Sequence, residues 1–304
     1  MSTTTSEQYK EFQDRFKTLA RKHPEIIKNT LSNIFTMRLI GNKTHGDLAE
    51  IGITEFINQF MKDYECKHVG KDLFRAKEHE EDIIIIYTPT NEEFPVSLKA
   101  YGDGPLQLST DKEFLMFKYL KKLGKSYGDT IEDKDTINDI FLSDEFQSLN
   151  SVNVLALIYR EKQEQCNILV FDFEKMKEDT ARILYIDKGE YYDKNSQKVI
   201  KGGRRKHPIY MFINNKGDYI CEVRYGGASA NALQRGLWTN TQRAAGYFKS
   251  LTDGCSQDEA GWIQYKPKTT LVDLIRLALN STEIGHKAAQ PILQQYINDI
   301  RQNI

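Results

Sequence analysis

The sequence predicts an α/β protein with a mixed central sheet flanked by helices. Three apolar runs of strand length support this prediction, at 83–87, 151–159 and 166–173, and each is typical of a buried strand. Amphipathic helical patterns come first in the chain, at 6–36 and 46–64. The order of helices, strands, a helix and more strands indicates an α/β core around a mixed sheet.

The elements follow in order from local signals. Residues 6–36 are expected to form two helices that separate at His23-Pro24, because proline is accepted in the first turn of a helix. The helix at 46–64 has an apolar stripe, and a strand near 67–76 leads from it into a hairpin. The other expected elements are a turn at 102–105, a helix at 110–123, strands at 182–188, 208–214 and 219–225, an exposed loop at 189–208, and helices at 229–251, 270–280 and 284–302.

Length and composition allow one large domain or two modest ones. At 304 residues, with 39% hydrophobic and 28% charged residues, the chain has ordinary globular proportions. We place a boundary near residue 190, which separates a core at 1–190 from a partner-binding region at 191–304. No apolar run has the length of a membrane helix, and no secretory signal precedes the first helix. Scattered cysteines and histidines without zinc spacing favour a cytoplasmic protein without structural metal.

Charge is balanced overall but unevenly distributed along the chain. Residues 198–249 contain ten Lys and Arg residues against two acids, whereas 129–145 contain seven acids against one lysine. Such asymmetry indicates one surface suited to phosphates and another that repels them. Two solvated surface patches would give the same pattern.

One acid and one amine are expected to meet across the hairpin that joins 81–87 to 95–101. If the chain reverses at Thr90-Asn91, antiparallel pairing places Asp82 opposite Lys99. Side chains alternate along strands, so Ser97 and Lys99 share one face and Asp82 joins them there. Taken singly, Asp82 is equally explained as a strand-start residue, and Lys99 as an edge lysine whose stem is buried.

Glu50 is the candidate for a second carboxylate. It lies at the margin of the apolar stripe of the 46–64 helix, where a buried charge needs a partner such as a metal ion or a lysine. The alternative is an acid in the first turn of a helix, stabilised by the helix dipole. The members of the stripe are Ala49, Ile53, Phe56, Ile57 and Phe60.

Together, Asp82, the Ser97-Leu98-Lys99 segment fifteen residues later and Glu50 on a preceding helix resemble the PD-(D/E)xK nuclease superfamily. More specifically, the pattern resembles type II restriction endonucleases that have serine at the second acid position and take a carboxylate from a helix. It covers residues 44–110, and Glu81 stands where the pattern has proline. It implies a restriction-endonuclease-like core in which Asp82 and Glu50 bind Mg²⁺ and Lys99 assists hydrolysis. It also implies a homodimer acting on double-stranded DNA.

Two further segments are candidates for substrate contact. Gln107 follows the Ser97-Leu98-Lys99 strand after a glycine-containing turn, and its amide suits phosphate or substrate, although a plain loop is the alternative. The basic region is expected to contact DNA through a phosphate clamp at 202–206 and a helix on which Asn231 and Arg235 point the same way. A small-residue helix packed on a sheet is the competing interpretation. The proposed DNA-binding residues are Arg204, Arg205, Lys206, Arg224, Ser229, Asn231, Gln234, Arg235, Thr239 and Thr241.

The sequence therefore predicts a magnesium-dependent, sequence-specific endonuclease of a restriction–modification system. A repair or structure-selective nuclease on the same core is one alternative. A DNA-binding protein with a degenerate nuclease core is another, because Ser97 replaces an expected acid. No Walker loop, dinucleotide-binding glycine motif or nucleophile elbow is present to favour another enzyme class.

Overall fold

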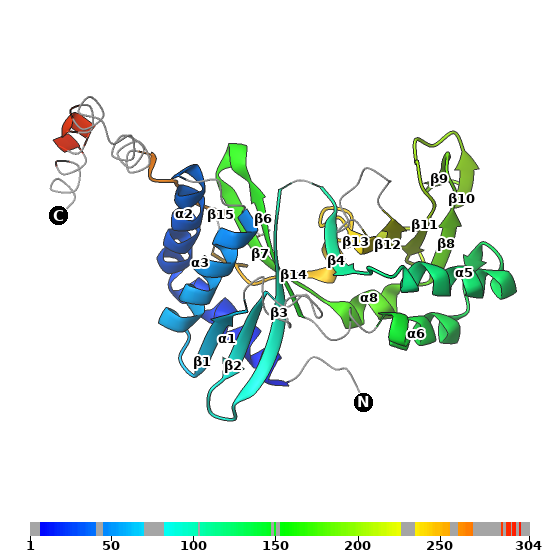
Figure 1. Ribbon diagram of the computed structural model, residues 1–304, viewed down its shortest axis with the longest axis horizontal. Coiled ribbons are helices and arrows are strands. Elements are labelled where there is room, and N and C mark those ends of the chain that lie inside the picture. The colour runs from blue at the N-terminus through cyan, green and yellow to red at the C-terminus, as the bar shows by residue number, and fades with distance from the viewer. Residues whose placement is uncertain are drawn as a thin grey trace.

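The described residues form two large β-sheets and one two-stranded sheet, and three N-terminal helices cover the outer face of the first large sheet (Figure 1). The computed structural model describes residues 7–40, 45–69, 82–102, 104–146, 149, 153–225, 235–255 and 261–269, with isolated positions between 287 and 298. The fold is mixed α/β, with a mixed central sheet flanked by helices, as the sequence predicts.

The described helices are α1 (Glu7–Lys22), α2 (Pro24–Ile40), α3 (His45–Phe60), α5 (Leu115–Tyr127), α6 (Lys134–Leu142) and α8 (Phe173–Asp179), with short 3₁₀ turns η1 (Asp144–Phe146), η2 (Glu161–Gln163) and η3 (Ala245–Tyr247). The strands are β1 (Tyr64–His68), β2 (Ile83–Tyr87), β3 (Glu92–Tyr101), β4 (Leu106–Thr110), β5 (Thr130–Ile131), β6 (Asn153–Arg160), β7 (Gln165–Phe171), β8 (Arg182–Ile186), β9 (Glu190–Asp193), β10 (Lys198–Lys201), β11 (Ile209–Ile213), β12 (Tyr219–Tyr225), β13 (Arg235–Thr239), β14 (Phe248–Ser250) and β15 (Ile263–Gln264).

The first sheet, here called the mixed sheet, has the order β1-β2-β3-β6-β7-β14, with β15 also on β7. Its strands pair antiparallel except β3 and β6, which run parallel. Strand β6 shows why the sheet is central. Leu155 and Leu157 point into the core under α1–α3, whereas Val154, Ala156 and Ile158 point into a second core on the other face. A continuous apolar strand is what burial on both faces requires.

The second sheet, here called the antiparallel sheet, has the order β4-β13-β12-β11-β8-β5. One of its faces joins β6 in the second core, to which α5, α6 and α8 contribute Met116, Ile140 and Met176. Its other face carries a smaller cluster that packs against Tyr192 and Val199 of the β9–β10 hairpin. Figure 1 shows this hairpin at the end of the molecule opposite α1–α3.

Helices α1 and α2 form where the sequence predicts them. Tyr9, Phe12, Phe16 and Ala20 recur at helical spacing and are all buried, which fixes the face that α1 presents to the mixed sheet. The chain then breaks at His23, and α2 begins at Pro24, whose missing N–H costs nothing at a helix start.

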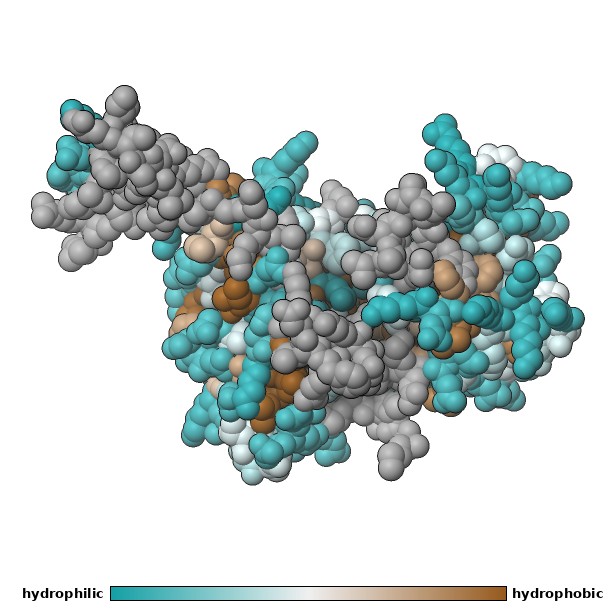
Figure 2. Space-filling view, viewed as in Figure 1, coloured by the Kyte–Doolittle hydropathy of each residue, from teal (hydrophilic) through white to brown (hydrophobic). Residues whose placement is uncertain are grey.

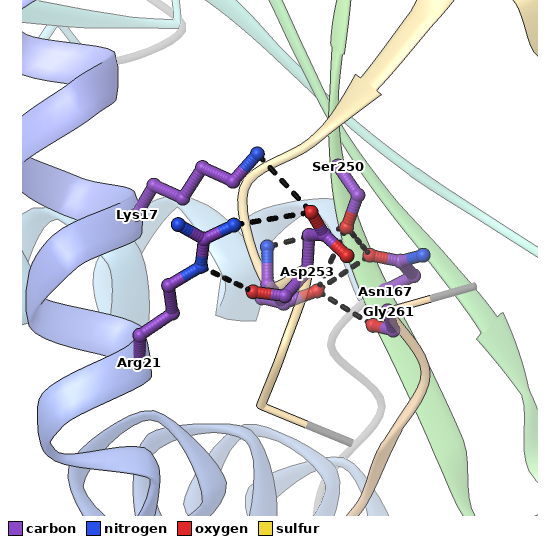
Figure 3. A network of polar contacts seen from close by, with 7 residues as sticks. Lys17, Arg21, Asn167, Ser250, Asp253 and Gly261 are labelled. Carbon is purple, nitrogen blue, oxygen red and sulfur yellow. Dashed lines mark hydrogen bonds and ion pairs between the residues drawn. The ribbon is translucent and has the colours of Figure 1, made fainter. Parts of the chain in front are cut away.

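The chain returns from the antiparallel sheet to the mixed sheet at β14 and β15. A polar network connects this segment to α1 and β7 (Figure 3). Asp253 accepts from Lys17 and Arg21 at 3.3 and 3.2 Å. On the sheet side, the side-chain oxygen of Asn167 accepts from the hydroxyls of Ser250 and Thr252 at 2.8 and 2.5 Å. These contacts link the N-terminal and C-terminal parts of the described chain on one edge of the mixed sheet.

The β2–β3 register differs from the sequence-based prediction by two residues. Ile83 lies opposite Val96, so the next position places Asp82 opposite Ser97 instead of Lys99. The turn is centred on Pro89-Thr90, one residue earlier than expected, and it closes with Asn91 at a φ of +57°. Because the error is even, each side chain keeps its predicted face.

Three predictions around the antiparallel sheet are wrong. The segment 189–208, predicted as a loop, contains the β9–β10 hairpin, and the helix predicted at 110–123 starts only at Leu115, after the unpredicted strand β4. The helix predicted at 229–251 is contradicted by β13 and β14. Thr239 ends β13, so the residues around it alternate across a sheet.

The proposed boundary near residue 190 does not separate the two sheets. Strands β4 and β5 from the first part lie in the antiparallel sheet, and β14 and β15 from the second part lie in the mixed sheet. Residues 70–81, which include most of the strand predicted at 67–76, lie outside the described residues, as do the helix predicted at 270–280 and most of 284–302.

Candidate active site

Asp82 is the centre of the candidate site. It precedes β2, and its Oδ2 accepts a hydrogen bond from the backbone N–H of Leu98 at 2.7 Å and from the Ser97 hydroxyl at 3.1 Å. The Lys99 Nζ lies 3.7 Å from the same oxygen. The prediction that Asp82, Ser97 and Lys99 share a face and meet is therefore matched by the contacts, although the direct partner of Asp82 is Ser97.

These three residues lie where the mixed sheet meets the second core. Ser97 and Lys99 are the parallel neighbours of Val154 and Ala156 on β6, which both belong to that core. Ser97 is 2% exposed, and the Lys99 side chain is 20% exposed. A mostly buried amine beside a carboxylate has strengthened electrostatic interactions compared with a pair in open water.

Glu50 reaches the same end of the sheet from α3. Its carboxylate is buried, and its Oε2 lies 2.6 Å from Nε2 of His68, the last residue of β1. Burial raises the pKa of Glu50, the hydrogen bond from His68 opposes this, and the negative charge of Asp82 raises the pKa further. The charge of Asp82 therefore acts on Glu50 from the same end of the sheet, although Glu50 lies on the α3 face and Asp82 meets Ser97 on the face of the second core.

A ladder of polar contacts holds α3 against β1. Asn58 brackets Cys66, donating to its carbonyl at 3.0 Å and accepting from its N–H at 2.7 Å. One turn back on the helix, the Thr54 hydroxyl lies 3.6 Å from the Cys66 sulfur. Another turn back, Glu50 meets His68. From the Thr54–Cys66 contact to the Glu50–His68 contact, four helical residues rise about 6 Å and two strand residues about 6.7 Å, so the two steps match.

His68 is the residue that the sequence-based interpretation missed. A strand predicted at 67–76 begins too late to show that His68 follows Tyr64 and Cys66 on the face beneath α3. Strand alternation from Tyr64 would have placed His68 under the helix that carries Glu50. The signal was therefore present in the sequence, and the strand boundary concealed it.

Gln107 is placed away from this hairpin, on β4 of the antiparallel sheet. It is buried, its amide donates to the Thr110 hydroxyl, and it pairs in register with Trp238. The expectation that it would act beside Lys99 because the chain continues from that strand is not supported by these contacts.

The basic residues form a different kind of cluster. Glu222, on β12, has an almost buried carboxylate whose Oε1 lies 3.5 Å from Nη1 of Arg224 and 3.6 Å from Nη1 of Arg205. The Arg224 guanidinium also stacks on Trp238, 4.1 Å from the ring centre. Arg205 and Arg224 therefore have partners within the protein, whereas Arg204 and Lys206 on either side of Arg205 are exposed.

The remaining DNA-binding predictions have mixed outcomes. Thr239 was expected to contact phosphate, but it is fully buried and its hydroxyl donates to the Ile220 carbonyl at 2.5 Å, so it is unavailable on this surface. Thr241 is half-buried in the turn after β13. Arg235 begins β13, which contradicts the helix on which it was to align with Asn231. Ser229, Asn231 and Gln234 lie outside the described residues.

Within residues that the structure describes, no three His, Cys, Asp or Glu side chains stand close enough to hold a metal ion together. None of the described helices has the length and apolarity needed to cross a membrane. Comparison with known proteins gives no matching family model, no matching curated protein and no matching solved structure.

Proposed function

We propose that this protein is a magnesium-dependent, sequence-specific endonuclease of the type II restriction class, acting on double-stranded DNA. The observation that carries the proposal is the contact of Lys99 with Asp82 on adjacent strands, with Glu50 interacting electrostatically from α3. Two acids and one amine at the same end of a sheet are the groups that phosphodiester hydrolysis requires.

The donor set suits a hard divalent cation. All three contacts of Asp82 fall on Oδ2, and no described residue bonds its Oδ1. Glu50 likewise uses Oε2 toward His68. Carboxylate oxygens with the remaining positions filled by water are a normal coordination set for Mg²⁺. Bound there by Asp82 and Glu50, the cation would lower the pKa of a water ligand and neutralise charge that develops on the phosphate.

The chain itself provides orientation and charge. The Leu98 N–H and the Ser97 hydroxyl fix the Asp82 carboxylate, so Ser97 acts as a positioning residue in place of a second acid. Lys99 holds a positive charge beside that carboxylate, where it would orient the attacking water or stabilise the phosphate oxygens in the transition state.

Two surfaces support the proposed partners. Figure 2 shows hydrophilic side chains over the β9–β10 hairpin, close in sequence to the exposed Arg204 and Lys206, which suits a DNA backbone. Hydrophobic side chains reach the surface over α3 in the same view. Exposed apolar residues there and on α2 line a cavity of about 340 Å³ and suit the homodimer that the restriction-enzyme resemblance implies. They are Met37, Ile51 and Phe60.

The test incubates the purified full chain with plasmid DNA and Mg²⁺, beside Lys99→Ala and the control Lys67→Ala. Lys67 is also on a strand of the mixed sheet, but its partner is the exposed Glu65. We expect discrete fragments from the wild type and from Lys67→Ala, and none from Lys99→Ala. A smear would indicate an unspecific nuclease, and an inactive wild type would contradict the proposal.

A further inference from the structure

We infer that His68 is a positioning residue that fixes Glu50 for cation binding, an inference that rests on the proposed function. Its Nε2 lies 2.6 Å from Glu50 Oε2 and belongs to the last residue of β1, while Glu50 lies in the first half of α3. The contact therefore joins a helix to a strand, and both ends are anchored by the rest of the fold.

The partner strand connects this contact to Asp82. His68 lies opposite Ile83 in the β1–β2 register, and the next residue of that strand, Val69, donates its N–H to the Asp82 carbonyl at 3.1 Å. His68 and Asp82 thus belong to adjacent pairs of an antiparallel ladder, so their side chains leave opposite faces of the sheet at the same end. Since His68 holds Glu50, the ladder sets the position of the Glu50 carboxylate relative to that of Asp82.

The other polar contacts between α3 and β1 fix the helix but not the Glu50 side chain. The Asn58 and Thr54 contacts with Cys66 set the height of α3 along β1, but they leave the longer Glu50 side chain with rotamers to choose from. A hydrogen bond to one carboxylate oxygen selects a rotamer and leaves the other oxygen available. Partners of ligating carboxylates contribute in this way to metal affinity, and their removal costs about 10- to 100-fold.

The contact differs from an ordinary surface ion pair of the same residue types. His23 and Glu25 also form a pair, at 3.4 Å, but their side chains are 54% and 63% exposed. In the His68–Glu50 pair the carboxylate is 12% exposed and the imidazole 41% exposed. The His68 ring shields one side of a buried carboxylate while its own edge remains accessible, so the residue can be replaced without opening the core.

The experiment measures Mn²⁺ binding to the full chain by titration calorimetry, using wild type, His68→Gln, His68→Ala and the control His23→Ala. The amide nitrogen of glutamine can occupy the place of imidazole Nε2 and donate to Glu50. We expect His68→Ala to weaken Mn²⁺ binding about 10- to 100-fold. His68→Gln and His23→Ala should stay within about threefold of the wild type, and circular dichroism should show all four proteins folded.

The possible outcomes separate this inference from the nuclease proposal. Equal affinity of His68→Ala and wild type would overturn the positioning role. Equal loss in His68→Ala and His68→Gln would also overturn it, because only a direct imidazole ligand would behave in that way. Failure of the wild type to bind Mn²⁺ would contradict the proposed magnesium site itself. Binding that depends on the Glu50 hydrogen bond, without DNA cleavage, would leave the inference standing and remove the nuclease.

Discussion

The two sheets use charged residues in opposite ways. At the end of the mixed sheet, Asp82 and Glu50 each use one carboxylate oxygen for contacts within the protein. The charges of the two acids repel each other. In the antiparallel sheet, Glu222 lies between Arg205 and Arg224, so opposite charges satisfy one another. The charge of Asp82 raises the pKa of Glu50, whereas the three charges in the triad of Glu222, Arg205 and Arg224 offset one another.

The largest effect is expected at Asp82. Asp82→Asn keeps the shape of the side chain but removes the charge that would hold the cation and pair with Lys99. Plasmid nicking should fall about 10²- to 10³-fold, the usual loss when one electrostatic group of a hydrolytic site is removed. Asp63→Asn is the control, because Asp63 pairs with Arg15 and is one-third exposed. A tenfold loss or less in Asp82→Asn would contradict the assignment.

The antiparallel sheet should be most sensitive at Gly236. Its φ is +120°, and a Cβ there would lie 2.0 Å from the Ser109 carbonyl oxygen on β4. Gly236→Ala should therefore lower the free energy of unfolding by about 3 kcal/mol or more, measured by urea titration. Gly246→Ala is the matched control, since an added Cβ there meets nothing within 4 Å. Similar stabilities for the two variants would show that β4 and β13 can move apart at little cost in free energy.

Glu222→Gln tests whether the arginine triad supports the fold. Removing the carboxylate leaves two guanidinium groups, each only 27% exposed, without a counter-charge. We expect the free energy of unfolding to fall by about 3 kcal/mol, as for other broken buried pairs. Asp253→Asn, which removes a carboxylate that is 40% exposed and pairs with Lys17 and Arg21, should cost less than about 1 kcal/mol. A larger loss of stability in Asp253→Asn than in Glu222→Gln would contradict the role of the triad in supporting the fold.

The smallest effect is expected at Thr239, where two interpretations give different results. The buried hydroxyl predicts that Thr239→Val loses about 1 kcal/mol of stability and leaves DNA affinity unchanged. A phosphate contact would instead lower DNA affinity at constant stability. Arg204→Gln is the positive control, because an exposed phosphate-contacting arginine should reduce the salt dependence of DNA binding by about 0.9 in log–log slope. Fluorescence anisotropy with a labelled duplex measures both variants.

The sequence was sufficient for the class of fold and for much of the candidate site, because both depend on alternation. A register error of two residues left Asp82, Ser97 and Lys99 on one face, since the side-chain period of a strand is two. His68 was missed because the start of β1 was misplaced by three residues. Strand boundaries carry weak local signals, whereas alternation within a strand is strong.

The antiparallel sheet was harder to predict because its pairings are distant in sequence. Strand β13 is held between β12 and β4, and β4 lies more than a hundred residues earlier. The segment 229–251 was predicted as a helix, but β13 and β14 within it pair with strands that are distant in sequence. Tertiary context overrides local propensity most readily in segments whose own preference is weak.

The route of the described chain has a consequence for engineering. The backbone passes between the two sheets four times, at β3–β4, β5–β6, β7–β8 and β13–β14. Truncation after β7 would strip β14 and β15 from the edge of that strand and leave its N–H and C=O groups open to other chains. Neither sheet can be transplanted as a contiguous cassette. Changes to either sheet would have to be point substitutions or loop grafts within the intact chain.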